Sequence, residues 1–518
     1  MDVDEEPQPF RSDGQGHPME TIYPFSRGVS ILKELPVDNI FQILSFSDPK
    51  DIVAFSETCQ AFLQITSTRT VWLNALRRVC EINSLFKPSF PFDDMSLLDL
   101  QRAAIFGAAP RFTRRLYKQE ADNGAMFPFH RRVFNPRVTK SSKVASEDSG
   151  TLKTLHLIPG GRFLIASTST LVHLFDLGYD ATKLIRPHAL ASVALPGPGD
   201  PSISVLPTDD GTGLEVMVKA RSYEVASRTC AIAHYQIFPL ATCPEFVARS
   251  ETPTVIEDRV EEGFLIKPGL SLLQRARKIF IWDTVRNLWA SWKADEFPEE
   301  VFAYQDHIIT ISRKTITIWE IPTPHCDTAD ESLLENYPSM LSLSHPFPRK
   351  SLDIASATAV TSSTRWFSAT SIKPCFLSIV GWKGGARYLA RYTMQSLPRG
   401  ANRNLPGSIP ILMDTSPISA EWDHLVMLEE VQPCGADALS VWTSESQGIE
   451  VHISPMPTEK QAEGPPFKTV RLFEYPGVDH SVNFDFSLCP ITGRLCTMTG
   501  YNSEILVVDF LVPEWKSD

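Results

Sequence analysis

Few residues in this sequence combine a type and a spacing that could do chemistry. The stretch TDDGTGLEV (208–216) has the acids and glycines that a metal-binding loop could use, but this composition is also typical of a turn between two β-strands. His325 and Cys326 are adjacent in a proline-rich loop, and the other histidines are dispersed along the chain. We therefore expect a hairpin turn at 208–216 and no zinc site.

The motifs that usually carry catalysis are missing from the sequence. It contains no G-x-x-x-x-G-K-[ST] phosphate loop, no G-x-S-x-G elbow, no H-E-x-x-H pair and no EF-hand loop. No spacing of acids or histidines nominates a general acid and base. We predict no catalytic residues, no metal and no cofactor. An enzyme whose acids or histidines converge only in the folded chain is the less favoured alternative.

The charges of the chain are divided unevenly. The formal net charge of −12 argues against a general nucleic-acid binder. Residues 1–20 carry six acids and one base, whereas residues 102–143 carry ten bases and two acids. We expect 1–29 to be a disordered acidic tail. The basic stretch is either a solvated linker or a docking site for an acidic partner.

The cysteines and the hydropathy pattern indicate a cellular compartment. Nine cysteines without a C-x-x-C pair favour reduced thiols. We find no apolar signal segment and no run of about 18 apolar residues. The expected location is cytoplasmic or nuclear, with no membrane partner.

The elements that would position a functional surface begin with a small helical unit. In ELPVDNIFQILSFSDPKDIV (34–53), apolar residues recur at helical spacing, and Asp48-Pro49 predicts the start of a second helix. Two more short helices follow, carrying Phe62 and Trp72. A unit of roughly 45 residues cannot bury apolar side chains on so many sides, so an exposed apolar face and a partner are expected.

This unit resembles the F-box, a helical module that docks onto the Skp adaptor of cullin-based ubiquitin ligases. The resemblance covers about residues 33–73 and rests on Leu35-Pro36, Ile40, Ile43-Leu44, Asp48-Pro49-Lys50-Asp51-Ile52, Cys59 and Trp72. It implies adaptor contact by Leu35, Pro36, Ile40, Ile43, Leu44 and Ile52, with Trp72 internal. Ser47 stands where the family usually has Leu, which would weaken binding unless Phe46 compensates. An ordinary N-terminal helical hairpin is the alternative.

Beyond residue 150 the pattern changes to short β-type runs. The segment LHLIPGGRFLIASTSTLVHLFDLG (155–178) resembles a WD-repeat blade, with Phe175 in the usual Trp place. Its closing strand has echoes at 231–237, 278–283, 315–320, 386–394, 448–454 and 504–510. These predict a β-propeller of seven blades at roughly 53 residues each. We interpret Trp282 and Trp319 as packing residues. A kelch-type propeller stays open, and a β-sandwich is less favoured.

The predicted fold class is therefore multidomain, α plus all-β. We expect a tail (1–29), an F-box module (30–80), a helical and basic connector (81–145) with a helix break near Gly107 and Pro110, and the propeller (146–518). The resemblance implies a substrate-recruiting, non-catalytic subunit of a Skp–cullin–F-box ubiquitin ligase with an unknown protein target. The alternatives are a scaffold that binds the adaptor without driving degradation and a propeller enzyme. Arg365, Arg387 and Arg391 are weak candidates for target binding.

Overall fold

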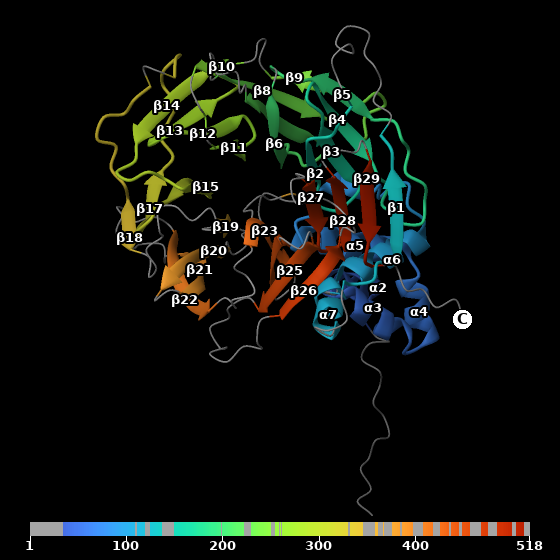
Figure 1. The fold of residues 1–518 in the computed structure, drawn as a ribbon. Helices are drawn as coiled ribbons and strands as arrows, with labels where there is room; N and C mark the ends of the chain where they lie inside the picture. The colour runs from blue at the N-terminus through green and yellow to red at the C-terminus, as the bar shows by residue number, and fades with distance from the viewer. Residues whose placement is uncertain are drawn as a thin grey trace, which may run out of the picture.

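A computed structural model gives the fold of most of the chain. It describes residues 35–108, 111–119, 125–136, 150–197, 199–221, 229–249, 254–257, 260, 262–329, 332–344, 358–360, 366, 376–383, 386–396, 408–417, 425–434, 437–444, 448–455, 468–474, 484–499 and 504–511. Short helices come first, and antiparallel sheets follow (Figure 1). None of the described helices is long and apolar enough to cross a membrane.

The helical part begins as the sequence predicts. Its elements are α2 (Val37–Phe46), α3 (Pro49–Ser56), α4 (Gln60–Thr66), α5 (Arg69–Ile82), the 3-10 turn η1 (Lys87–Ser89), α6 (Leu97–Ala108) and α7 (Arg111–Lys118). Pro49 is the first residue of α3, where its missing N–H is no loss. The predicted helix break near Gly107 and Pro110 is confirmed, because α6 ends at Ala108 and α7 begins at Arg111.

The helices α2 to α6 share one hydrophobic core. Apolar residues spaced three or four positions apart lie on one side of each helix and meet in this core. Trp72 is buried in it and donates a 2.7 Å hydrogen bond from its indole N–H to the Thr66 carbonyl, so its predicted internal role is confirmed. The buried members are Ile40, Leu44, Ile52, Phe62, Val71, Trp72, Ala75, Leu76, Cys80, Leu85, Phe90, Phe92, Met95, Leu100 and Ala104.

The β part consists of seven antiparallel sheets among the described residues. From the inner to the outer strand, the first is β2 (Thr154–Leu157), β3 (Phe163–Ser167), β4 (Leu171–Asp176) and β5 (Ala191–Ala194). The second sheet is β6 (Asp200–Pro207), β7 (Leu214–Arg221) and β8 (Thr229–Ile237), with both β9 (Val247–Ala248) and β10 (Thr254–Glu257) paired to β8. The third is β11 (Glu262–Lys267), β12 (Leu270–Arg275), β13 (Lys278–Asp283) and β14 (Leu288–Lys293). The fourth is β15 (Glu300–Tyr304), β16 (His307–Ile311), β17 (Thr315–Glu320) and β18 (Leu341–Ser344).

The remaining sheets contain strands from the second half of the chain. The fifth sheet is β19 (Thr358–Val360), β20 (Phe376–Lys383), β21 (Ala386–Ser396) and β22 (Ser408–Pro417). The sixth is β23 (Leu425–Cys434), β24 (Asp437–Ser444), β25 (Gly448–Pro455) and β26 (Lys468–Glu474). The seventh is β27 (Phe484–Cys489), β28 (Arg494–Thr499), β29 (Ile505–Asp509) and β1 (His130–Phe134). The first-listed strands of neighbouring sheets contact one another, as β2 does with β6 and with β27, and the sheets form a ring (Figure 1). This is a β-propeller.

Each segment that echoes the closing strand of a blade lies in a different sheet, as its third strand. The segments 278–283 and 315–320 coincide with β13 and β17, and the other five overlap β4, β8, β21, β25 and β29. The predicted packing of two tryptophans is also confirmed. Trp282 is buried between the sheets of β7 and β12, and Trp319 between those of β12 and β16.

The ring is closed by a strand from the segment predicted as a connector. β1 pairs antiparallel with β29, so the last sheet contains three strands from the C-terminal part and one from residues 130–134. The predicted connector 81–145 thus includes a strand of the propeller. On the inner side, side chains of β27 bind backbone N–H groups of the first sheet: Asp485 Oδ2 accepts from Leu155 at 2.7 Å and Ser487 Oγ from Leu157 at 3.0 Å.

Candidate functional site

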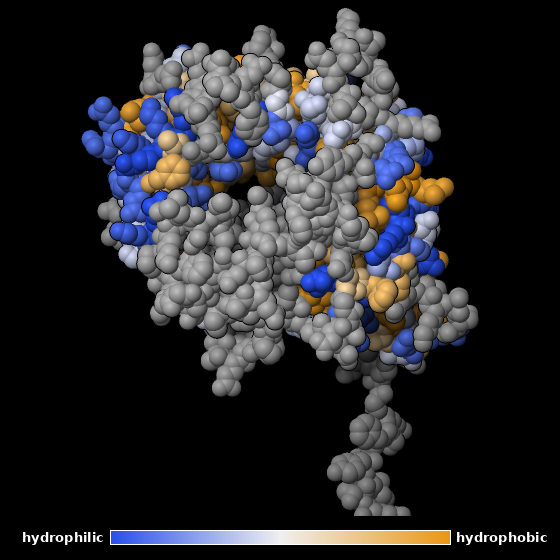
Figure 2. Space-filling model, viewed as in Figure 1, coloured by the Kyte–Doolittle hydropathy of each residue, from blue (hydrophilic) through white to orange (hydrophobic). Residues whose placement is uncertain are grey.

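The first helix, α2, exposes apolar side chains that its own fold does not bury. Ile43 is 48% exposed and Phe46 is 69% exposed, although both lie on a helix whose other side is buried in the core. Val37 at the start of α2 and Leu63 on α4 are also exposed. In the view of Figure 2, hydrophobic side chains gather over the helical part of the molecule. Exposed apolar side chains in this number indicate a partner surface.

The six residues predicted to contact an adaptor divide between the surface and the core. Pro36 and Ile43 are exposed, and Leu35 is half-buried against the helical core. Ile40, Leu44 and Ile52 are buried, with Ile52 at 0% exposure. These three side chains therefore pack inside the helical unit. Adaptor contact stays a prediction, and the residues placed to make it without rearrangement are Leu35, Pro36 and Ile43.

Two further surface residues were not among the predicted contacts. Val37 and Leu63 sit at helical spacing with buried neighbours, so the sequence pattern alone does not separate them from the core. Phe46, which the sequence suggests only as a compensating residue, has its ring 5.9 Å from the Arg78 guanidinium of α5. Arg78 also donates a hydrogen bond to the Ser45 carbonyl at 3.4 Å, which fixes the end of α2 against α5.

Ser47 is the C-cap residue that follows α2, and it is half-buried. Its Oγ donates a hydrogen bond to the Ile43 carbonyl at 2.9 Å, and its backbone N–H donates to the Leu44 carbonyl at 3.2 Å. The hydroxyl thus satisfies a carbonyl at the open end of the helix. A leucine at this position would lose that hydrogen bond and present an apolar side chain next to Ile43 and Phe46.

The helical unit is fixed to the propeller by an aromatic side chain. Phe86, between α5 and η1, is fully buried in the core formed by the first two sheets. Its ring meets the ring of Phe163 on β3 edge to face at 6.1 Å and that of Trp366 at 5.9 Å. Such pairs stabilise by about 0.5–1.5 kcal/mol each beyond the burial of their area.

Hydrogen bonds at the β2–β3 turn complete this junction. The Pro159 carbonyl accepts from the Phe86 N–H at 2.9 Å and from Ser89 Oγ at 3.1 Å. Arg162 donates to the Pro88 carbonyl at 3.1 Å and forms a 2.8 Å ion pair with Asp176. The contacts come from one turn of the first sheet and one turn of the helical unit, so the two parts are held in a fixed orientation.

The three arginines proposed for target binding do not form a common surface among the described residues. Arg365 lies outside the described residues. Arg387 belongs to β21, where its backbone is opposite Trp382 of β20. Arg391 of the same strand is buried, so it is not a candidate for surface recognition in this conformation. The target-binding residues of the propeller stay unassigned.

The stretch with the composition of a metal loop forms a turn. Residues 208–213 connect β6 and β7, as predicted, and Asp210 accepts hydrogen bonds from the hydroxyls of Thr208 and Thr212. These hydrogen bonds lower the pKa of Asp210 to about 2. In the part of the chain that the structure describes, no group of three or more His, Cys, Asp or Glu residues could hold a metal ion.

Comparison with known proteins identifies the helical part. Residues 32–74 match the F-box domain family. No curated protein matches the chain. Solved structures similar to it include the WD40 domain of SCAP from fission yeast (10% identity, 71% of this chain and 83% of that chain, TM-score 0.39) and the N-terminal domain of Nup159 (11% identity, 69% and 89%, TM-score 0.38).

A third similar structure is Hsv2 from Kluyveromyces lactis (10% identity, 68% of this chain and 90% of that chain, TM-score 0.39). With TM-scores below 0.5, these similarities carry no weight for function. The assignment of a propeller rests on the strand order and ring closure of the chain itself.

Proposed function

Because this chain carries an F-box domain at residues 32–74 ahead of a β-propeller, we propose that it is the substrate-recruiting subunit of a Skp–cullin–F-box ubiquitin ligase. The observation that supports this most directly is the exposed apolar side of α2, with Ile43 and Phe46. We propose that the Skp adaptor covers this side and that the propeller binds a protein target.

In this role the chain acts by proximity and does no bond chemistry itself. Holding a target next to a partner enzyme raises the effective concentration of the reacting groups. The junction around Phe86 and Pro159 supports this role, because a fixed orientation between adaptor and target limits the positions that the target can sample. The end of the first sheet at the β2–β3 turn is occupied by the helical unit. We therefore place the target at the opposite end, where the β3–β4 turn (168–170) lies.

The test is direct binding of the full chain to a purified Skp adaptor. The chain with Ile43→Asp and Phe46→Asp should lose binding at least 100-fold, because two charges would be desolvated in an apolar interface. The matched control is Ile82→Asp with Leu98→Asp, which also places two charges at exposed apolar positions but lies outside residues 32–74. Near-normal binding is expected for the control, with melting curves checked for both.

Two outcomes would contradict the proposal. The wild-type chain could fail to bind the adaptor while melting as a folded protein, or both double variants could lose binding equally. If the adaptor binds but no cullin is recovered with the complex, the chain would be a scaffold that joins the adaptor without driving degradation.

A further inference from the structure

The strand that closes the ring carries an apolar and basic surface that the proposed function does not use. Alternate residues from 127 to 133 are exposed, with Phe127 at 78% and Val133 at 64%. Between them lie the exposed side chains of Phe129 and Arg131. Figure 2 shows hydrophobic and hydrophilic side chains next to one another over the position of β1.

Helix α7 extends this surface with more positive charge. Arg115 joins the two elements, because its guanidinium donates hydrogen bonds to the carbonyls of Phe510 and Phe127 and lies 4.5 Å from the Phe129 ring centroid. Arg114 and Lys118 on the same helix are exposed. We name the set Arg114, Lys118, Phe127, Phe129, Arg131 and Val133 the closing-strand surface.

The charge of this region is mostly positive, because residues 111–136 contain six Lys or Arg and two acids, Glu120 and Asp122. The six bases all belong to the described residues 111–119 and 125–136. One edge of β1 pairs with β29, and no described strand pairs with its other edge. An unpaired edge presents backbone N–H and C=O groups to any extended segment that approaches. The region therefore combines a positive field, exposed aromatic side chains and open backbone groups.

The chain itself contains a segment of complementary charge. Residues 1–20 carry six acids and one base, together with Phe10. About 14 residues separate this segment from Leu35, and such a spacer can extend to about 50 Å. A tether of this length would give a local concentration on the order of millimolar, so even a weak ionic contact would be well populated.

We propose that the acidic segment 1–20 binds the closing-strand surface of the same chain. The contact is ionic, between the carboxylates of the segment and Arg114, Lys118 and Arg131, with apolar contact to Phe127. Pro7, Pro9 and Pro18 have no N–H to donate, so a continuous β-ladder is not part of the proposal. The bound segment would exclude other acidic partners from this surface.

The experiment measures binding of a fluorescein-labelled peptide of residues 1–20 to two full-length proteins by fluorescence anisotropy. One is the wild-type chain. The other, named the neutralised chain, carries Asp2→Asn, Asp4→Asn, Glu5→Gln, Glu6→Gln, Asp13→Asn and Glu20→Gln, so that its own segment has no acidic side chain. The peptide should bind the neutralised chain saturably and the wild-type chain at least fivefold more weakly. Raising NaCl from 0.05 to 0.5 M should weaken binding at least tenfold.

Variants of the neutralised chain locate the contact. Arg114→Glu, Lys118→Glu and Arg131→Glu together should weaken peptide binding at least tenfold. The control triple, Lys267→Glu, Lys293→Glu and Lys314→Glu, reverses three exposed charges on other sheets and should change it less than twofold. If the variant with Arg114→Glu, Lys118→Glu and Arg131→Glu has a lowered melting temperature, the milder variant Arg114→Gln with Lys118→Gln is tested in its place. We expect it to bind the peptide threefold more weakly.

Three results would overturn the proposal. The peptide could show no saturable binding to the neutralised chain, or it could bind the wild-type chain equally well, which would mean that the segment does not cover its own surface. If the two triple variants lost peptide affinity equally, the peptide would be attracted to positive charge anywhere on the protein and not to the closing-strand surface.

Discussion

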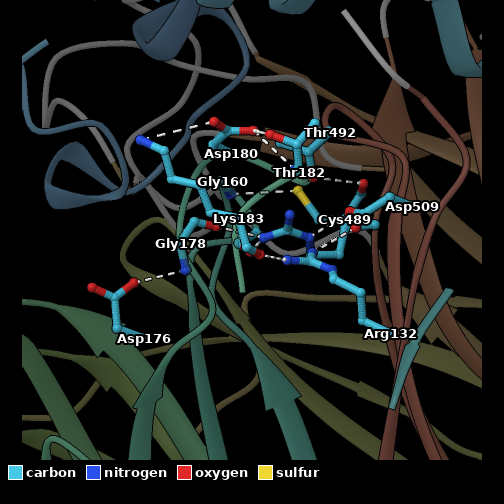
Figure 3. A network of polar contacts seen from close by, with 12 residues as sticks. Arg132, Gly160, Asp176, Gly178, Asp180, Thr182, Lys183, Cys489, Thr492 and Asp509 are labelled. Carbon is cyan, nitrogen blue, oxygen red and sulfur yellow. Dashed lines mark hydrogen bonds and ion pairs between the residues drawn. The ribbon is translucent and has the colours of Figure 1, made fainter. Parts of the chain in front are cut away.

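Arg132 and Asp509 are 377 residues apart in the chain, and their side chains meet at 2.6 Å. The first belongs to β1 and the second to the end of β29. Asp509 also pairs with Arg494 of β28 at 2.6 Å, and it is 2% exposed. The arginines reach the first sheet as well, because Arg132 donates to the Lys183 carbonyl at 2.9 Å and Arg494 to the Gly178 carbonyl at 2.7 Å. Figure 3 shows Arg132 and Asp509 in this network.

Removing the shared acid should open the closure of the ring. Burial lowers the pKa of Arg132, and the charge of Asp509 opposes this shift. Asp509→Ala would leave the buried guanidinium of Arg494 and the half-buried one of Arg132 without their counter-ion, and loss of a buried partner typically costs about 3–5 kcal/mol. We expect a clear drop in the melting temperature of the propeller. Arg286→Ala, which breaks a 3.9 Å pair of a highly exposed arginine, is the control and should cost less than about 1 kcal/mol. Equal shifts would contradict a structural role for the network.

Buried and exposed isoleucines of the F-box should respond in opposite ways. Ile52→Ala leaves a cavity in the helical core and should destabilise the helical unit by about 2–5 kcal/mol. Ile43→Ala should leave its stability within about 0.5 kcal/mol and weaken adaptor binding instead. Chemical denaturation followed by circular dichroism and titration with the adaptor separate the two effects. A large loss of stability in Ile43→Ala would show that this side chain belongs to the core.

Ser47→Leu should strengthen adaptor binding. Full burial of a leucine side chain is worth about 1.5–3 kcal/mol, which corresponds to roughly a 10- to 150-fold gain in affinity. Isothermal titration calorimetry with the purified adaptor measures it. Ser45→Leu is the matched control, because Ser45 also donates its hydroxyl to a carbonyl of α2, that of Gln42 at 2.7 Å. If Ser47→Leu bound the adaptor equally well or more weakly, the expectation that Ser47 in place of leucine weakens adaptor binding would be wrong.

Gly160→Ala should disturb the junction between the helical unit and the propeller. Gly160 has a φ of 105°, and an added Cβ would lie 2.5 Å from the Cβ and Oγ of Ser89. We expect faster proteolytic cleavage around residues 84–90 and a lower melting temperature. Gly150→Ala is the control, because its φ is also positive but nothing lies within 4 Å of the added atom. Similar behaviour of the two variants would assign the effect to backbone strain rather than to the junction.

His234 should make the propeller less stable in acid. It is buried on β8 with its ring 4.8 Å from that of Trp282, and burial lowers its pKa to about 3. In the unfolded chain a histidine titrates near pH 6.5, so the unfolded state takes up the proton first as the pH falls. Stability contributed by the neutral ring is therefore present above about pH 6.5 and is lost between that pH and 3, by roughly 1.4 kcal/mol per pH unit.

The measurement is the melting temperature between pH 7.5 and pH 4.5. His234→Gln should make this profile less steep, with the remaining slope due in part to His156, whose pKa burial lowers to about 4, whereas replacement of the exposed His188 by Gln should leave it unchanged. If the profiles of both variants match that of the wild type, His234 is not the group responsible.

The sequence predicts the elements that depend on local patterns. The F-box segment 33–73 agrees with the matched residues 32–74, and strands such as KIFIWD are recovered to the residue, because alternation, Trp-acid endings and proline positions are local signals. The number of blades stays a prediction, although the described residues form seven sheets. The burial of Arg391 could not be predicted, since burial of one residue in a strand depends on neighbouring sheets.

Non-local pairings are the part that the sequence does not predict. HRRVF lies in a basic stretch without apolar and polar alternation, its partner is more than 370 residues away, and no local signal indicates that pairing. The same limit applies to Ile40 and Ile43. Helical spacing predicts that both are on apolar positions, but which of them faces the core depends on α5.

Ring closure by β1 also sets the order in which this protein can mature during synthesis. The strand leaves the ribosome early, but its partner β29 is translated about 370 residues later, which takes roughly 20–75 s at typical elongation rates. In that interval the helical unit is complete and β1 has no partner. We expect nascent chains to be able to engage the adaptor before the propeller exists, and messages truncated ahead of residue 505 to yield proteins with an open ring.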